Sequence, residues 1–521
     1  MRENCNASGF NDMPNGESSG ATNRIAAYIL FVAIAGAPFL FGSRDPLTVA
    51  FWCGLLALGL LVASVRQLRA GHVAIIVGVA LIALCYGFVL HEQLADRPWI
   101  APFNPVWAQA SELLGKAVPP SVSIVRGEPF YAVGPALAAT LALLLGLVVG
   151  SDRTRANQTL EIAAWAGAAY GAYGIFALLV EPTAVLWREK VFYVGSLTAT
   201  FINRNTAATY FGSSAAVCLV LLLWRVRTQL PKGRIAWRKV PEHILLESGT
   251  DRQIIVRFLL LFACVAALFL TSSRAGVLIS LAVLTGEFFL FFRRDLRGAR
   301  TIISLVAFVA VAALVILQLG GGAVSGRIES SGLSDQGRLS AYRAVLRLIA
   351  DNPWFGTGWG TFAWAFPPYR GDDVSMMGVW DIAHSTPLEI AAELGIPLCL
   401  LVISAWIVAF VILIRGAIRR RRDAVVPIAA LSVSLIGVAH SMVDFSLQIP
   451  GYMIVAFALL GVGRRNRSCR HWLSSGRALR RAKPGWKNRT KKRRKNATAA
   501  AGSAPLLSAK TQRARLLAGL V

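Results

Sequence analysis

The chain has 521 residues, of which 55% are hydrophobic and only 16% are charged, and its net charge at pH 7 is +27. Soluble globular proteins carry roughly 25% charged residues, so this composition excludes an ordinary soluble protein of several domains. Repeated apolar runs of about 18 residues, each long enough to cross ~30 Å of hydrocarbon, indicate an integral membrane protein instead.

Hydrophobic runs define twelve candidate membrane-spanning segments. They cover residues 25–42, 47–65, 72–90, 131–150, 160–180, 206–224, 254–271, 275–292, 301–319, 386–414, 424–443 and 448–463. They predict an all-α fold, a polytopic membrane bundle of about twelve transmembrane helices, because a helix satisfies its own backbone polar groups inside a bilayer. We expect a polar N-terminus at 1–24, a transmembrane domain at 25–463 and a C-terminal tail at 464–521.

Basic residues occupy alternate connections between these segments. These connections hold Arg66 and Arg69, Arg153 and Arg155, the segment 225–253, four arginines in 293–300 and five in 415–422. Because short basic connections stay in the cytoplasm, the pattern predicts that both termini are cytoplasmic. The longer connections that then face outward are 91–130, 181–205 and 320–385.

The C-terminal tail contains most of the positive charge. Residues 464–521 include 18 lysines and arginines and no acidic residue. We expect this tail to bind anionic lipid headgroups at the cytoplasmic surface. Its densest run, Lys491–Lys495, lacks any base-reading motif, so no nucleic-acid partner is expected.

The outward connection 320–385 contains an amphipathic pattern. Apolar residues recur there at helical spacing, with arginines on the other face: Leu339, Tyr342, Leu346 and Ile349 against Arg343 and Arg347. The pattern predicts a helix that lies in the membrane interface and ends at Asp351-Asn352-Pro353. The run Gly356-Thr357-Gly358-Trp359-Gly360 that follows predicts a turn whose backbone can approach a ligand closely.

His384 is the histidine with the most informative context. It precedes Ser385-Thr386-Pro387-Leu388-Glu389, in which Thr386 would be the N-cap of a helix and Glu389 would complete a capping box. His384 would then lie at the outer mouth of the tenth segment, beside free backbone N–H groups that favour anions. An imidazole is suited to general acid–base catalysis there. The alternative is a histidine that is merely solvated at the interface.

Three arginines fall at outward helix ends, where the positive-inside rule disfavours them. Arg204 lies in Phe201-Ile202-Asn203-Arg204-Asn205, Arg274 lies in the tight turn Ser273-Arg274-Ala275-Gly276, and Arg338 opens the amphipathic helix. Guanidinium groups bind phosphate oxygens through paired hydrogen bonds, so these residues are candidate phosphate ligands. Snorkelling to lipid headgroups is the alternative for each of them.

Other polar residues give weaker signals. Glu389 and Asp444 lie near outward helix ends, where polar residues are also common for purely structural reasons. Asp372-Asp373 is the sole adjacent acidic pair in 320–385, and no cluster of histidine, aspartate and glutamate has metal-ligand spacing. We therefore expect no metal and no nucleotide cofactor.

Several of these motifs, in this order, resemble the O-antigen ligase and polymerase family of bacterial polysaccharide assembly. The resemblance covers about residues 190–450 and includes the Asn203-Arg204-Asn205 and Ser273–Gly276 motifs, Arg338, and the run Asp351–Gly358. His384-Ser385, nine further residues and Gly395 complete it, in the family pattern H-[NSQ]-x9-G-x-x-[GTY]. This chain has Leu398 at the last position, which departs from the pattern that family ligases show.

The resemblance implies a glycosyltransferase-C-like membrane fold without metal or nucleotide. The donor would be a glycan on undecaprenyl diphosphate, and the acceptor a sugar hydroxyl on lipid A core or on a growing polysaccharide. Matched by motif, Arg204 and Arg274 would hold the diphosphate, with Arg338 as a further donor-binding candidate. His384 would deprotonate or orient the attacking hydroxyl, and Asn203, Glu389 and Asp444 would support the site. The large loop at 320–385 would be periplasmic, and the protein would lie in the bacterial inner membrane.

Other functions remain open at this point. The same family includes polymerases, and a ligase that acts on a protein hydroxyl is a third version of the same chemistry. A polysaccharide transporter or flippase is a different class, but its sites lie near the bilayer midplane, whereas the candidate residues here gather at outward helix ends. A scaffold that recruits cytoplasmic partners would explain the basic tail and leave the outward arginines without a role.

Overall fold

The computed structural model describes residues 15–230, 251–294, 336–372, 374, 379–420 and 424–463. The chain divides into two units, Met1–Arg465 and Asn466–Val521, and every described element belongs to the first. The predicted segment at 301–319 and the basic tail at 464–521 lie outside the described residues.

Seven described helices are long and apolar enough to cross a membrane. They are α3 Ala70–Leu94, α5 with α6 (Glu128–Tyr131 and Val133–Val149), α7 Arg153–Val180, α8 Arg204–Gln229, α10 Arg252–Leu270, α11 Arg274–Phe292 and α17 Ile396–Arg419. Shorter apolar helical stretches of 10–17 residues also occur among the described residues. They are Thr22–Gly36 within α1 (Asn15–Gly36), α2 Pro46–Val62, α18 Val425–Ser441 and α19 Pro450–Gly463. The chain is therefore a multi-pass, mainly helical membrane protein, as predicted, while the count of twelve spans stays a prediction.

Shorter elements connect these helices. They are η1 Phe41–Ser43, η2 Val65–Gln67, α4 Val106–Leu114, β1 Ala184–Val185, β2 Arg188–Glu189, α14 Gln336–Asp351, α15 Phe362–Ala365, η5 Pro367–Tyr369, α16 Thr386–Leu394 and η6 Ser446–Gln448. The two strands form one antiparallel pair, with Ala184 opposite Glu189 and Val185 opposite Arg188.

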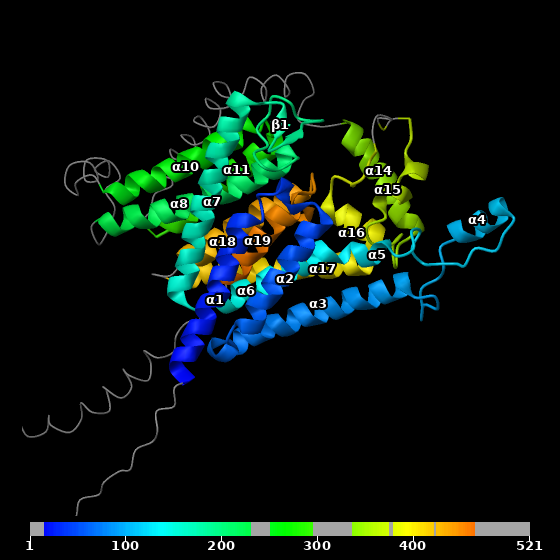
Figure 1. The fold of residues 1–521 in the computed structure, drawn as a ribbon, viewed down its shortest axis with the longest axis horizontal. Coiled ribbons are helices and arrows are strands. Elements are labelled where there is room, and N and C mark those ends of the chain that lie inside the picture. Colours follow the sequence, from blue (N-terminus) through cyan, green and yellow to red (C-terminus); the bar gives the residue numbers. More distant parts are fainter. Residues whose placement is uncertain are drawn as a thin grey trace, which may run out of the picture. The chain divides into compact units, whose positions relative to one another are not determined.

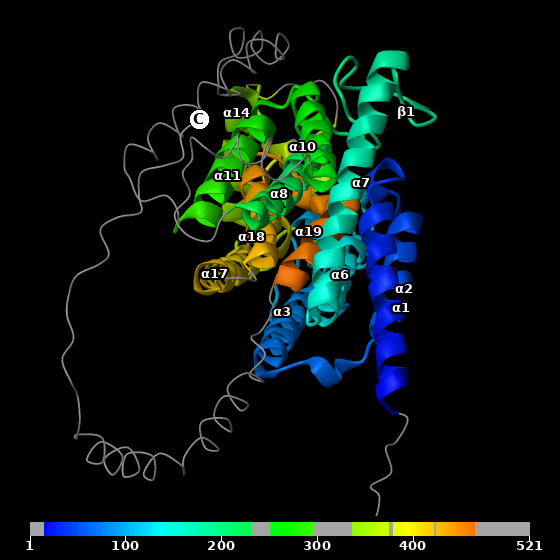
Figure 2. The ribbon, with the colours of Figure 1, turned by 90° about the vertical axis from the view of Figure 1, so that its left-hand side faces the viewer.

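Helix α8 lies at the centre of the bundle. In the most apolar 18-residue stretch of this helix, 89% of the residues are buried. They are buried because α7, α10, α11 and α18 all pack against α8 (Figures 1 and 2). A helix enclosed by protein need not present apolar side chains to lipid. This explains why α8 contains several buried threonines and serines, among them Thr209 and Ser213, and yet remains stable in the membrane.

Helices α6 and α19 approach each other very closely, and Figure 2 shows them side by side. A Cβ atom at Gly146 would lie 2.3 Å from the carbonyl oxygen of Ala458, and one at Gly461 would lie 2.2 Å from that of Leu143. Small residues therefore allow the backbones to meet, as in other membrane helix pairs. This contact fixes α19, and with it the segment that precedes Pro450.

The predicted tenth segment, 386–414, is not one helix. The chain breaks at Gly395, where α16 ends and α17 begins, and Gly395 has a φ of 87°. A Cβ atom there would lie 2.1 Å from the carbonyl oxygen of Trp354, so the position requires glycine. The continuous span was therefore a wrong prediction, and the membrane-spanning part starts at Ile396.

Helices α14, α15 and α16 gather at one end of the bundle and share a small apolar core (Figure 1). Helix α14 ends at Asp351, as predicted, and the residues of its predicted apolar face are partly exposed and partly buried. Leu339 and Leu346 are 41% and 54% exposed, and the buried residues are Ala341, Ala344, Val345, Leu348 and Ile349. The helix packs against protein through these buried side chains, because α16 lies directly on that face.

Candidate functional site

Two of the predicted arginines begin helices, as their sequence context indicated. Arg204 is the first residue of α8, and the side chain of its N-cap Asn203 accepts a hydrogen bond of 2.6 Å from the backbone N–H of Asn205. Arg274 is the first residue of α11, whose N-cap Ser273 accepts one of 3.3 Å from Gly276. Asn203 is thus a helix cap, and both arginines project from helix N-termini, which favour anions.

Asp444 is the centre of a buried hydrogen-bond network that joins these two helix ends. Asp444 is buried, and only 1% of its surface is exposed. The side-chain amide of Asn205 donates to Asp444 Oδ2, and the backbone N–H of Phe445 donates to Oδ1 at 2.8 Å. The hydroxyl of Ser273 in turn donates to Asn205 Oδ1 at 2.9 Å. The residues next to Arg204 and Arg274 are therefore locked to one carboxylate.

His384 faces the same carboxylate. Its Nδ1 atom lies 3.7 Å from Asp444 Oδ1, a distance of electrostatic contact and too long for a hydrogen bond. The imidazole lies between the rings of Trp380 and Phe445, with centroid distances of 5.5 and 5.2 Å, and 25% of the side chain is exposed. The hydroxyl of Tyr342 donates to the backbone oxygen of His384 at 2.8 Å. The ring is held in place and remains accessible.

The third predicted arginine, Arg338, also approaches Asp444. Its Nη1 donates to the carbonyl oxygen of Val443 at 2.8 Å, and its Nη2 lies 4.0 Å from Asp444 Oδ2. Burial alone would raise the pKa of the Asp444 carboxyl, but His384, His440 and Arg338 outweigh it and hold this pKa below its ordinary value. Asp444 is therefore an anion that these positively charged and titratable groups surround.

A second layer of polar residues supports the network from behind. His440 Nδ1 lies 3.1 Å from the hydroxyl of Ser446, which lies 2.9 Å from the hydroxyl of Thr209. Thr209 also donates to the backbone oxygen of Asn205 at 2.9 Å. This layer ties α8 to α18 and η6 and so fixes the position of Asn205.

Glu389 has a different role from the predicted one. The N-cap of α16 is Ser385, not Thr386, and no side chain caps this helix end. Instead, Glu389 Oε2 accepts a hydrogen bond of 2.8 Å from the backbone N–H of Ala383. The capping box was a wrong prediction, because the carboxylate reaches one turn further back. Burial and the neighbouring Glu393 raise the pKa of the Glu389 carboxyl, which holds the backbone just before His384.

The glycine-rich run serves to pack the site end. A Cβ atom at Gly356 would lie 2.2 Å from the carbonyl carbon of Glu393, and the backbone N–H of Thr357 donates to Ala392 at 2.9 Å. The Gln93 side chain adds a further tie by accepting from the Trp359 N–H at 3.0 Å. This run therefore clamps α16, and its close backbone approach is to protein rather than to a ligand-sized space.

An apolar groove of about 840 Å³ runs between α3, α6, α17 and α19. Its walls are mostly aliphatic and aromatic, with residues such as Leu90, Leu143, Val408 and Phe457. It extends to Thr386 and Ile390 on α16, within two residues of His384 at its nearest point. The groove therefore connects the apolar flank of the bundle to the candidate site.

The sequence analysis assigned four residues of this region to the candidate site and did not assign the others to it. His384, Asp444, Arg338 and the helix end at Arg204 were predicted from charge and position. Asn205 and Ser273 were named as parts of motifs and Tyr342 as part of the amphipathic face, but none of them was assigned a role in the site. Among the described residues, no group of three histidine, cysteine, aspartate or glutamate side chains could hold a metal ion.

Comparison with protein families gives one match. Residues 259–403 match the family described as O-antigen ligase. This range contains Arg274, Arg338, His384 and Glu389, whereas Arg204 and Asp444 lie outside it. No curated protein matches the chain.

Proposed function

We propose that this membrane protein is a glycosyltransferase of the ligase and polymerase type, because residues 259–403 match the family described as O-antigen ligase. It transfers a glycan from undecaprenyl diphosphate to a sugar hydroxyl, with lipid A core as the acceptor. The observation that carries the proposal is the contact between His384 and Asp444 beside two helix ends that begin with arginine.

His384 is the proposed general base. The acceptor oxygen attacks the anomeric carbon of the donor sugar while Nε2 of His384 takes the hydroxyl proton. The bond between that carbon and the diphosphate oxygen breaks, and its electron pair leaves with the lipid diphosphate. Asp444 stabilises the resulting imidazolium, since its carboxylate lies 3.7 Å from Nδ1 and is ionised. Such positioned proton transfer contributes typically 10²–10⁴-fold in rate.

Arg204 and Arg274 are the proposed ligands of the diphosphate. Both side chains are partly exposed at helix N-termini, where the helix dipole adds positive potential. Guanidinium groups fixed in this way stabilise the charge that grows on the leaving group. We propose that these arginines supply the positive charge that a metal ion supplies in other diphosphate sites. Arg338 would assist from the far side of Asp444.

The apolar groove between α3 and α17 is the proposed site of the polyprenyl chain. Its volume of about 840 Å³ and its apolar lining suit a long hydrocarbon. A chain in this groove would leave its diphosphate near α16, where the groove reaches Thr386. We propose that this end of the bundle faces the periplasm, because the described basic connections around Arg66 and Arg155 belong to the opposite helix ends.

A polymerase of the same family is the alternative with the same donor chemistry. It would use a lipid-linked glycan as acceptor in place of lipid A core. A transporter or flippase receives less support, because the candidate groups lie at helix ends rather than at the bilayer midplane.

The test is a gene deletion followed by gel analysis of surface polysaccharide. Loss of a ligase leaves bare lipid A core while carrier-linked glycan accumulates, and loss of a polymerase leaves single-repeat products. Complementation of the deletion strain with His384→Ala or with Arg274→Ala should not restore the surface polysaccharide. Arg343→Ala is the matched control, because Arg343 is an exposed arginine on α14 that does not belong to the hydrogen-bond network around Asp444.

Two outcomes would count against the proposal. Unchanged surface polysaccharide in the deletion strain would show that the protein does not catalyse the proposed reaction. Full complementation by both site variants would leave the reaction open and overturn the site assignment.

A further inference from the structure

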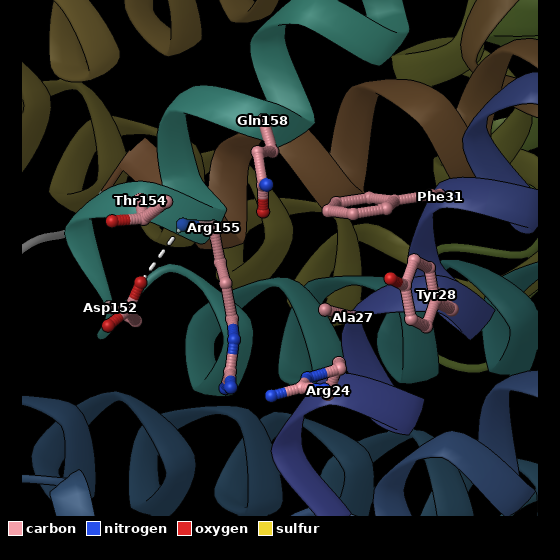
Figure 3. A pocket seen from close by; sticks show the side chains of 8 residues that line it. All are labelled: Arg24, Ala27, Tyr28, Phe31, Asp152, Thr154, Arg155 and Gln158. Carbon is pink, nitrogen blue, oxygen red and sulfur yellow. Dashed lines mark hydrogen bonds between the residues drawn. The ribbon is translucent and has the colours of Figure 1, made fainter. Parts of the chain in front are cut away.

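A second cavity lies at the other end of the bundle, between α1 and α7. It has a volume of about 300 Å³ and is lined by Arg24, Ala27, Tyr28, Phe31, Asp152, Thr154, Arg155 and Gln158 (Figure 3). Helix α7 ends at Val180, and the connection after it leads to Arg204, so the first turn of α7 lies far from His384. Nothing in the proposed reaction uses this cavity.

The charge of the cavity favours an anion. Figure 3 shows the side chains of Arg24 and Arg155 extending from different helices toward the same space. Asp152 is the one acidic residue in the lining, and its Oδ1 accepts a hydrogen bond of 3.0 Å from the backbone N–H of Arg155. The cavity lining therefore carries a net positive charge, because it holds two guanidinium groups and one carboxylate. Phosphate oxygens match guanidinium geometry.

The other wall of the cavity is apolar and enters the membrane. No charged residue follows Arg24 until Arg44, so Arg24 lies at the boundary of an apolar run. Phe31 is seven positions further along α1, which corresponds to about 10 Å at 1.5 Å per residue. Its ring lines the same cavity as the two arginines. A free phosphate ion would contact only the arginines, whereas a phospholipid can contact the arginines with its phosphate and the apolar wall with its acyl chain.

We propose that this cavity binds a membrane phospholipid through its phosphate. Arg24 and Arg155 contact the phosphate oxygens, Gln158 and Thr154 offer hydrogen bonds to the polar backbone of the lipid, and Phe31 packs against the first carbons of an acyl chain. The lipid joins α1 to α7, the helix that packs on the central α8. Its binding is separate from the attraction of the basic tail for anionic surfaces, because it depends on two defined side chains.

The experiment measures lipid binding to the full-length protein in detergent. The purified protein is titrated with phosphatidylglycerol, and native mass spectrometry gives the fraction that holds one lipid. We expect Arg24→Gln and Arg155→Gln each to weaken the first binding event about tenfold, or ~1.4 kcal/mol. Arg66→Gln is the matched control, since Arg66 is exposed in η2 and does not line the cavity, and it should leave binding unchanged. None of these variants alters a residue of the proposed active site.

A second arm identifies the source of the phosphate. Phe31→Ala should weaken phosphatidylglycerol binding, and inorganic phosphate at millimolar concentration should not displace the lipid. If inorganic phosphate binds equally well and Phe31→Ala has no effect, the ligand is a free anion and the lipid proposal is wrong. Equal weakening by Arg66→Gln would also overturn it, because binding would then follow overall charge. Arg24 is exposed, so Arg24→Gln tests the site even if Arg155→Gln does not fold.

Discussion

Nδ1 of His384 and Oδ1 of Asp444 lie 3.7 Å apart, although the two residues come from different helix ends. Asp444 is buried and ionised, and the amide of Asn205 and the N–H of Phe445 hold its orientation. A carboxylate fixed in this way can orient the imidazole and stabilise its protonated form. The relationship therefore leads to predictions about each partner.

Asp444→Asn should lower the turnover rate by about 10²-fold, with little change in the affinity for the donor, because the carboxylate acts on the protonated imidazole rather than on the bound lipid. Initial rates at several donor concentrations separate the two quantities. A variant with ordinary turnover and weakened donor affinity would instead place Asp444 in donor binding.

Asn205→Ala should destabilise the folded protein by about 1–3 kcal/mol, since it removes a donor from buried Asp444 and an acceptor from Ser273. Asn205→Asp should be worse, because it places a second carboxylate against Asp444. The melting temperature in detergent reports both effects. Asn157→Ala, an exposed position in α7, provides the control and should change little. Equal stability of Asn205→Asp and the unmodified protein would show that the network is not formed.

Gly395→Ala should destabilise the protein by about 2 kcal/mol or more, through a positive φ and a clash with the carbonyl oxygen of Trp354. Gly78→Ala in α3 is the matched control, since nothing lies within 4 Å of its Cβ position. There the helix interior should gain roughly 0.5–1 kcal/mol. Thermal unfolding compares the two, and similar behaviour of both variants would argue against a break at Gly395.

Glu393 should make stability depend on pH. Burial raises the pKa of its carboxyl to about 7, although N–H groups such as that of Phe362 partly offset this effect. The unfolded value is near 4.3, so the folded protein binds the proton more tightly. This contribution to stability is complete below that value and is lost as the pH rises through 7. Glu393→Gln should remove this dependence between pH 4.5 and 7.5, and an unchanged profile of melting temperature would contradict the assignment.

The positions of Arg204, Arg274 and His384 could be predicted because each is a polar residue at the end of a long apolar run. The role of Asn205 could not, since it depends on a contact with Asp444, far along the chain. Hydrophobic pattern alone cannot report which helices meet. Asn205 and Thr209 are four residues apart and share a helix face, but this spacing is equally common in helices without function.

The break at Gly395 had a signal that hydrophobicity obscured. Gly395-Ile396-Pro397 combines a glycine with a proline at the first helical turn, which is typical of a new helix start. The apolar residues on both sides made 386–414 look continuous. The sequence pattern placed Leu339 and Leu346 on the apolar face of an interfacial helix, and both are exposed. It did not indicate that α16 would cover a second face of α14, because that contact depends on residues far along the chain.

The central claim is that His384 accepts the proton of the attacking hydroxyl. The most direct measurement is the initial rate of glycan transfer by the purified protein from a synthetic lipid diphosphate donor at saturating concentration. We predict that His384→Ala lowers this rate by about 10²-fold or more while donor binding is retained, and that Arg343→Ala remains within about twofold of the unmodified protein. A His384→Ala rate close to that of the unmodified protein would contradict the account.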